Sequence, residues 1–344
     1  MVPCRRFGKP DRALAAKSHA IMPHVMRISR TGGPEVLEWV DAPAPVAGPG
    51  EALVRHTAIG LNFIDTYQRS GLYKMTLPAV MGNEGVGVVE VVGDGVTVVK
   101  PGDRVAYQGA IGAYAEVRTI AAEKLVVVPP GVDDRTAAAA FLKGVTAYYL
   151  LYRTFKVEKG AVILWHAAAG GVGQIGCQWA KALGATVIGT VGSDEKVALA
   201  KANGCDHVIN YRTEDYVARV KEITGGAGVD VAYDSVGADT FPATLDCIRP
   251  TGMWVSFGNA SGPVPPFAPL LLMQKGSLFA TRPTTAHYFA KRADLETAAA
   301  ALFKVIADGT VKVAIGQTFA LKDAVEAHRA LESRATTGAT VLVP

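Results

Sequence analysis

The stretch AAAGGVGQIG, residues 167–176, constrains the fold of this chain more than any other part of the sequence. It follows the apolar run AVILW and places Gly171, Gly173 and Gly176 in the spacing G-x-G-x-x-G. A strand is predicted before it, a helix after it and another strand within about thirty residues, which is the context that a dinucleotide-binding motif requires. We expect Gly170 and Gly171 to let the backbone turn and approach a pyrophosphate, and Gly173 to let the strand and helix pack closely.

The middle of the chain continues this pattern of strand followed by helix. The expected strands are AVILWH, TVIGTV, HVIN, VDVAYDSV, GMWVSFG and SLFATR, and the expected helices include GQIGCQWAKALG and DEKVALAKANG. Alternating strands and helices predict a doubly wound parallel sheet with helices on both faces.

The two ends of the chain follow a different pattern. Residues 24–141 contain short β-rich runs, among them EALVRHTAI, GVGVVEVVG, RVAYQG and AEVRTI, divided by turns rich in Gly, Pro and Asp. After residue 283 come two helical patterns, LETAAAALFKVIADG and LKDAVEAHRALES, and a final short strand, ATVLVP. The sequence therefore predicts an α/β protein in which a β-rich domain accompanies the parallel-sheet domain.

Composition excludes several classes of protein. The 344 residues are 49% hydrophobic and carry a formal charge of only +4, without runs of Lys and Arg interleaved with aromatic residues, so no nucleic acid partner is expected. Every apolar run is too short to span a membrane. The four cysteines are far apart and form no C-x-x-C pair, which argues against a zinc cluster or a disulfide framework and favours the cytoplasm.

The first 21 residues carry basic side chains but lack the continuous apolar core of a secretory signal. We interpret residues 1–21 as a non-folding extension. An amphipathic transit peptide is the alternative, because the segment is basic and poor in acids.

The end of the second predicted strand indicates which dinucleotide is bound. NAD sites usually place Asp or Glu there to bind the ribose hydroxyls, whereas this chain has Gly192 and Ser193. The missing carboxylate leaves room for a 2'-phosphate, for which Lys196 can supply a charge and Tyr211 a hydrogen bond. NADPH is therefore the expected cofactor. In the alternative interpretation Lys196 is a solvated helix lysine and Tyr211 a loop aromatic.

Several motifs together resemble one family. They are NFIDTYQRSGLY, AAAGGVGQIGCQWAKALGA, GTVGSDEK, VINYR, YDSVG, VSFGNASG and LESRAT. From about Met22 to the C-terminus the chain is similar to the zinc-independent quinone oxidoreductases, relatives of zeta-crystallin within the medium-chain dehydrogenase/reductase superfamily. NFIDTY followed closely by GLY is specific to this branch, whereas the glycine motif is common to the superfamily.

The resemblance implies a GroES-like catalytic domain built from both ends of the chain and a Rossmann domain between them. It places residues 22–143 and 284–344 in the discontinuous catalytic domain and residues 144–283 in the NADP(H)-binding domain. The active site is then expected in the cleft between the two domains.

The resemblance also implies site residues. It assigns the pyrophosphate to Gly170, Gly171, Val172 and Gly173, the 2'-phosphate end to Lys196 and Tyr211, the nicotinamide half to Asn62, Thr146 and Phe257, and a further cofactor contact to Arg334. Asn62, Tyr67 and Tyr73 are the candidate catalytic residues, the two tyrosines as aromatics of the cleft. Alternatively, Arg334 neutralises the negative end of its helix, and Tyr67 is a core ring with a bonded hydroxyl.

No metal is expected. Zinc alcohol dehydrogenases carry Cys near position 62 and the motif Gly-His-Glu where this chain has GNEG, so Asn62 and Asn83 stand where zinc ligands would be. An amide is neither a thiolate nor an imidazole. Glu84 remains, and we expect it to be bonded within its own domain.

Without a metal to polarise an alcohol or ketone, a quinone is the expected acceptor, because its product anion is delocalised. An activated alkene conjugated to a carbonyl is the second candidate, as in enoyl and alkenal reductases. A dinucleotide-binding protein with a structural or RNA-binding role is the third.

The apolar, β-prone run GSLFATR falls late in the Rossmann sheet, where an uncovered edge strand would pair with a second copy, so a homodimer is expected.

Overall fold

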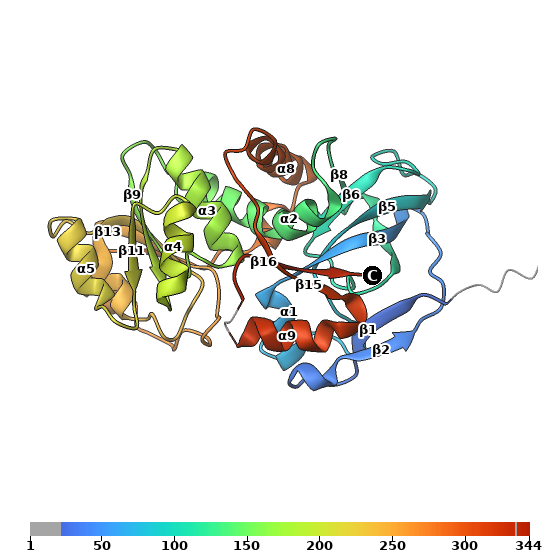
Figure 1. The fold of residues 1–344 in the computed structure, drawn as a ribbon, viewed down its shortest axis with the longest axis horizontal. Coiled ribbons are helices and arrows are strands. Elements are labelled where there is room, and N and C mark those ends of the chain that lie inside the picture. The colour runs from blue at the N-terminus through green and yellow to red at the C-terminus, as the bar shows by residue number, and fades with distance from the viewer. Residues whose placement is uncertain (1–21, 334–335) are drawn as a thin grey trace, which may run out of the picture.

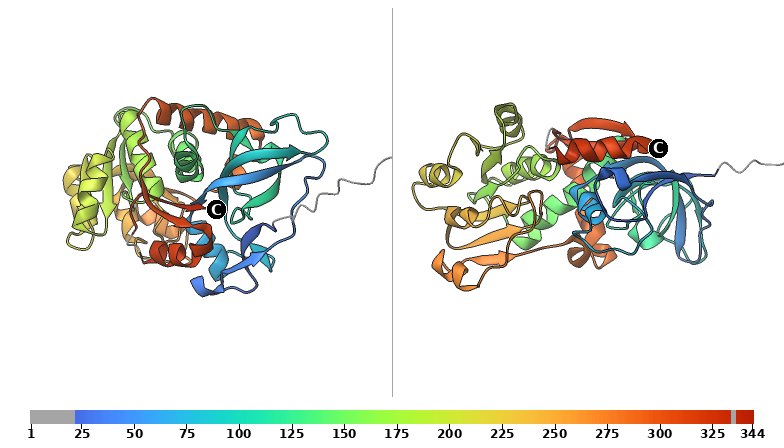
Figure 2. Two further views of the ribbon diagram at one scale, coloured as in Figure 1. Left: turned by 45° about the vertical axis from the view of Figure 1, so that its right-hand side comes forward. Right: turned by 90° about the horizontal axis from the view of Figure 1, so that it is seen from below.

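The structure, a computed structural model, describes residues 22–333 and 336–344. It has two halves, one built from the middle of the chain and one from both of its ends (Figure 1). The right-hand panel of Figure 2 shows the blue N-terminal and red C-terminal segments together in one half. The prediction of a non-folding extension at residues 1–21 lies outside the described residues, and so does the assignment of Arg334 to the cofactor.

The middle of the chain forms a six-stranded parallel sheet with the order β11-β10-β9-β12-β13-β14. Its strands are β9 (Val162–Trp165), β10 (Thr186–Val191), β11 (His207–Asn210), β12 (Val229–Asp234), β13 (Ile248–Ser256) and β14 (Phe279–Thr281). All six coincide with the predicted apolar runs. The order reverses between β9 and β12, which makes the carboxyl ends of these two strands the expected place for a ligand.

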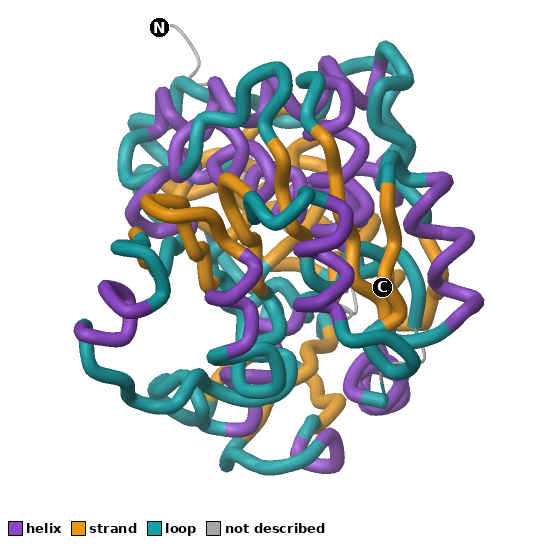
Figure 3. The backbone as a smooth tube through the Cα atoms, turned by 90° about the vertical axis from the view of Figure 1, so that its left-hand side faces the viewer, coloured by secondary structure: helices purple, strands orange, loops and turns teal. Residues whose placement is uncertain are grey.

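Helices cover both faces of this sheet (Figure 3). They are α3 (Gly171–Ala182), α4 (Asp194–Ala202) and α5 (Tyr216–Ile223), with the short α6 (Leu270–Gln274) before β14. Two apolar cores result, one on each face. Neighbouring residues such as Leu164 and Trp165 belong to different cores, because successive side chains of a strand point to opposite faces.

The other half is a mostly antiparallel sheet of seven strands in the order β15-β16-β3-β5-β6-β8, with β7 also paired to β3. Its strands are β3 (Glu51–Leu61), β5 (Glu84–Val92), β6 (Arg104–Gln108), β7 (Val117–Ala121), β8 (Val126–Val127), β15 (Ile315–Ala320) and β16 (Ala339–Val343). A small sheet of β2 (Glu38–Asp41), β1 (His24–Ile28) and β4 (Ala79–Val80) adjoins it. The predicted β-rich architecture of this half is confirmed.

Five α-helices of the described residues belong to this half or connect it to the parallel sheet. They are α1 (Phe63–Ser70), α2 (Asp134–Tyr149), the short α7 (Thr285–Tyr288), α8 (Arg292–Ala307) and α9 (Ala324–Glu332). α2 is buried along most of its length and runs without a break across residues 143 and 144, where we divide the two domains. Across residues 22–333 and 336–344, none of the helices has the length and apolar character needed to span a membrane.

Candidate active site

The glycine-rich turn between β9 and α3 has a geometry that only small residues allow. Ala167 begins it with a left-handed backbone, at a φ of 55°. A Cβ on Gly173 would lie 2.4 Å from the carbonyl oxygen of Ala167, and a Cβ on Gly176 would lie 2.2 Å from the Trp165 ring. We expected Gly173 to let the strand and helix pack closely. Gly176 has that role against β9, while Gly173 accommodates the turn.

The N-terminus of α3 offers its backbone to an anionic group. The helix begins at Gly171, and its N-cap residue, Gly170, has no side chain to cap the first N–H groups. Gly170, Gly171, Val172 and Gly173 thus lie together at one helix end, where free N–H groups and the helix dipole favour a phosphate. Gly338 forms a β-bridge to Gly170, so the C-terminal segment runs beside the loop.

A second group of predicted residues lies at the carboxyl ends of β10 and β11. A Cβ on Gly192 would be 2.4 Å from the Tyr211 hydroxyl oxygen, which puts the exposed phenol against the backbone of Gly192. Ser193 occupies the N-cap position of α4, and Lys196 lies half-buried in the first turn of that helix. The exposed Asp194 accepts a hydrogen bond of 2.8 Å from Asn210 Nδ2. The four predicted residues of the 2'-phosphate end therefore lie near one another.

Asn62 belongs to a buried polar cluster with Glu84 and Lys143. Its Nδ2 donates to Glu84 Oε2 at 2.8 Å and to the Gly60 carbonyl at 3.1 Å. Both partners are acceptors, and the side-chain oxygen of Asn62 faces the backbone N–H of Asp65 in the capping box of α1. An amide oxygen has two lone pairs, so one remains for a ligand. Glu84, fully buried, also accepts from Leu142 N at 2.6 Å and from Lys143 Nζ at 3.2 Å.

The same cluster connects the catalytic half to the glycine loop. Lys143 is only 5% exposed, and a Cβ on Gly171 would lie 2.9 Å from its Cδ. The lysine stem therefore packs against the loop while its ammonium pairs with Glu84. Two side chains, Glu84 and Lys143, therefore connect Asn62 to the predicted pyrophosphate site.

Asn83 is bound elsewhere. Its Nδ2 donates to Asp65 Oδ1 at 2.7 Å and to Gln68 Oε1 at 2.6 Å. Asp65 also accepts from Asn62 N, which caps α1, and burial raises the pKa of the Asp65 carboxyl to about 6. In residues 22–333 and 336–344 no three His, Cys, Asp or Glu side chains gather as metal ligands do. Because the amides of Asn62 and Asn83 donate to carboxylates, the residues present do not fit zinc.

The two predicted tyrosines meet the loop that follows β13. The Tyr67 hydroxyl accepts a hydrogen bond of 2.9 Å from Asn259 N, and its ring packs edge-on against Tyr73 with centroids 5.3 Å apart. Arg282, directly after β14, donates to the Tyr73 hydroxyl at 3.0 Å. Burial raises the pKa of Tyr67 to about 12, so this phenol is protonated at neutral pH and can donate.

Tyr67 and Asn259 border a cavity of about 320 Å³ between the two halves. It is lined by Phe63, Thr66, Tyr67, Ser70, Leu72, Asn259, Ala260 and Glu332. Phe257, two residues before Asn259, lies half-buried with its ring 6.2 Å from that of Trp165. Thr146 is buried on α2, where its hydroxyl donates to the Leu142 carbonyl at 2.7 Å.

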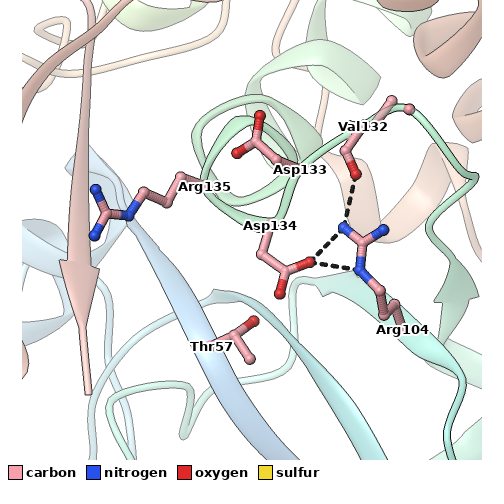
Figure 4. A pocket seen from close by; sticks show the side chains of 7 residues that line it. Thr57, Arg104, Val132, Asp133, Asp134 and Arg135 are labelled. Atoms are coloured by element: carbon pink, nitrogen blue, oxygen red, sulfur yellow. Dashed lines mark hydrogen bonds and ion pairs between the residues drawn. The ribbon is translucent and has the colours of Figure 1, made fainter.

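A wider hollow of about 690 Å³ lies on the catalytic half. In Figure 4 Arg104 donates to Asp134 and to the Val132 carbonyl, while Arg135 points away from them. No residue of the glycine loop or of the tyrosine pair lines it. Because Arg104 and Asp134 pair with each other, we assign no ligand to this hollow.

Three residues near the candidate site were not predicted from the sequence. Lys143, Asn259 and Arg282 come from α2, from the loop after β13 and from the end of β14. The available signal was positional: Asn259 and Arg282 each follow a predicted parallel strand, and ligands bind at the carboxyl ends of such strands.

Comparison with known proteins identifies both halves of the chain. Residues 48–130 match the family model "Alcohol dehydrogenase GroES-like domain", and residues 171–304 match the model "Zinc-binding dehydrogenase". The GroES-like fold predicted for the β-rich half and the dinucleotide-binding fold predicted for the other are confirmed.

Individual relatives align along nearly the whole chain. A quinone oxidoreductase of Salmonella typhimurium is 52% identical over 317 residues, covering 91% of this chain and 97% of its own length. A 2-haloacrylate reductase of a Burkholderia species is 45% identical over 325 residues, covering 92% and 98%. The crystal structure of Escherichia coli quinone oxidoreductase complexed with NADPH superposes with a TM-score of 0.92 at 50% identity, covering 93% and 100%.

Proposed function

The chain belongs to the quinone oxidoreductases of the medium-chain dehydrogenase/reductase superfamily, and from that premise we propose that it reduces quinones with NADPH in the cavity between its two halves. One observation carries the proposal. A cavity lined by Tyr67 lies between the half that carries the dinucleotide loop and the half in which amides replace the zinc ligands of related dehydrogenases.

The glycine loop fits NADPH, because its uncapped helix end and absent side chains leave a cradle for the pyrophosphate. We propose that Gly170, Gly171, Val172 and Gly173 hold that group. Gly192, Ser193, Lys196 and Tyr211 would then hold the 2'-phosphate end, and Thr146, Phe257 and Arg334 complete the cofactor site. When bound, NADPH supplies the hydride equivalent.

We propose that Asn62, Tyr67 and Tyr73 act on the reacting groups. Asn62 presents the second lone pair of its side-chain oxygen as an acceptor, because Glu84 and Gly60 hold its Nδ2 and Asp65 N takes the first lone pair. Tyr67 and Tyr73 donate toward the acceptor quinone, whose reduced oxygen takes its proton through them or from water.

A substrate screen at saturating NADPH tests this function. We expect 1,4-benzoquinone to be reduced faster than 2-alkenals or 2-haloacrylates. Faster reduction of the alkenes would favour the second candidate, and no acceptor-dependent NADPH oxidation would favour a binding protein.

We further propose residues 22–143 with 284–344 as the catalytic domain, residues 144–283 as the cofactor domain, and the cytoplasm as the location.

Activity is expected to be independent of zinc. The amides that replace the zinc ligands donate to Asp65 and Glu84, which leaves no thiolate or imidazole for the metal. Purified active protein treated with a chelator should keep its full rate of quinone reduction. Stoichiometric zinc by elemental analysis, together with activity lost on chelation and restored by the metal, would contradict this.

We also propose a homodimer that forms along β14. Among the strands of the described residues, this edge strand pairs with β13 alone, and Phe279 on it is 60% exposed. Light scattering at micromolar concentration should report a dimer for the wild type and a shift toward monomer for Phe279→Asp, since a charge on an edge strand opposes pairing. Val46→Asp, at an 85% exposed position of the other half, is the control. A wild-type monomer would defeat the proposal.

A further inference from the structure

Arg282 is a cation among the phenols of the cavity region. Its guanidinium donates to the Gly258 carbonyl at 2.8 Å, to Ser256 Oγ at 3.2 Å and to the Tyr73 hydroxyl at 3.0 Å. The Asn259 amide finds partners for both of its ends when its nitrogen faces the Gly258 carbonyl, at 2.9 Å. In that orientation Arg282 also donates to Asn259 Oδ1 at 3.1 Å. The positive charge thus lies at the carboxyl end of the Rossmann sheet and reaches across to the catalytic half.

These partners are all neutral oxygens. In residues 22–333 and 336–344 no carboxylate pairs with Arg282, whereas Arg69, Arg104 and Arg249 each bind one. Glu332, the carboxylate that lines the cavity, accepts from the buried Arg69 at 2.6 Å. The charge of Arg282 therefore remains available to an anion, and its side chain is exposed enough to meet one.

The hydrogen bonds also fix which way the phenols donate. A phenol has one proton, and its oxygen accepts. The Tyr67 oxygen accepts from Asn259 N and the Tyr73 oxygen from Arg282, so each hydroxyl proton points to another acceptor. For Tyr73 the nearby acceptor is Asn259 Oδ1 at 3.3 Å, a weak bond that a ligand oxygen can replace.

We propose, on the basis of the quinone reductase function, that Arg282 is a positioning residue that stabilises the oxyanion of the reduced quinone through Tyr73. The quinone gains two electrons and one proton from NADPH, leaving NADP⁺, and its carbonyl oxygen becomes a phenolate. Tyr73 donates a hydrogen bond to that oxygen, and one proton from water completes the hydroquinone. The guanidinium polarises the phenol at the moment when the negative charge develops.

The test uses para-nitrophenol, a redox-inert phenol whose phenolate absorbs visible light, bound to the wild-type protein with NADP⁺. Arg282→Gln should weaken binding of the phenolate form by about tenfold to a hundredfold, the range of one charge-assisted hydrogen bond. Binding of the neutral form should change little. kcat/KM for 1,4-benzoquinone should fall by a similar factor, with NADPH affinity unchanged by fluorescence titration.

Further variants separate positioning from structure. Arg282→Lys should recover part of the phenolate binding, because it keeps the charge. Tyr73→Phe should lose a similar factor, and the double variant should lose no more than the larger single loss. Arg249→Gln, at the opposite end of β13 and paired with Asp230, should leave phenolate binding unchanged.

Unchanged phenolate binding in Arg282→Gln would overturn the proposal. Equal weakening of phenolate, neutral phenol and NADPH binding would overturn it too, because it would mean that Arg282 only supports the structure. A failure of the proposed quinone reductase function can be told apart from a failure of the role proposed for Arg282. If the function fails, the wild-type protein does not reduce 1,4-benzoquinone, whatever the binding of para-nitrophenol shows.

Discussion

Lys143→Met is expected to lower the free energy of unfolding by about 3 to 5 kcal/mol, because it leaves the carboxylate of Glu84 buried without its cation. Glu84 is fully buried, and the Lys143 ammonium lies 3.2 Å from its Oε2. Methionine keeps most of the apolar stem that packs against Gly171, so the change isolates the charge. Urea denaturation of the wild type and the variant measures the difference.

Two controls make this result specific. The double variant Lys143→Met with Glu84→Gln removes both charges and should recover part of the loss, giving a coupling free energy from the double-mutant cycle. Lys304→Met breaks an exposed ion pair to Asp308 and should cost less than about 1 kcal/mol. If Lys143→Met costs no more than Lys304→Met, the buried pair does not stabilise the fold.

The cluster around Glu84 also explains what replaces a metal in this fold. In zinc dehydrogenases the ligands meet around a cation, whereas here the Asn62 amide and the Lys143 ammonium converge on one carboxylate. A fixed hydrogen-bond network can orient Asn62 toward a cofactor without a metal ion. Orientation of Asn62 is then linked to the same contacts that hold Lys143 against the glycine loop.

The sequence predicts the sheets well because their signals are local. Each Rossmann strand is a continuous apolar run between turn residues, and the glycine spacing identifies the connection that binds phosphate. Local sequence patterns do not predict the backbone conformation of the turn. Ala167 carries the positive φ that a glycine would adopt more easily, since tertiary contacts of the turn override its local preference.

The site residues divide in the same way. Tyr67 and Tyr73 both belong to the motif NFIDTYQRSGLY, residues 62–73. Arg282 contacts Tyr73 only through the fold, because it lies 209 residues later in the chain. Neither periodicity nor spacing can predict a contact of that range. Topology can narrow the search, because Asn259 and Arg282 both follow strands whose carboxyl ends share one edge of the sheet.

Lys196→Ala is expected to weaken NADPH binding by about tenfold to a hundredfold, because it removes one charge-assisted hydrogen bond of roughly 1.5 to 3 kcal/mol to the 2'-phosphate. Lys196 lies in the first turn of α4, beside Gly192 and the Tyr211 phenol and without an acidic residue at the end of β10. NADH lacks the phosphate, so its affinity should hardly change. Fluorescence titration of both cofactors measures the two dissociation constants.

Lys201→Ala, in the last turn of the same helix, is the matched control, since it removes an exposed lysine at the far end of α4. It should leave both affinities unchanged, whereas a loss of NADPH affinity there would indicate a general effect of charge. Equal weakening of NADH and NADPH by Lys196→Ala would mean that Lys196 supports α4 rather than the phosphate. The preference for NADPH would then have to arise from Tyr211 and the N-terminus of α4, because Gly192 and Ser193 stand directly after β10, where NAD sites usually carry an acid.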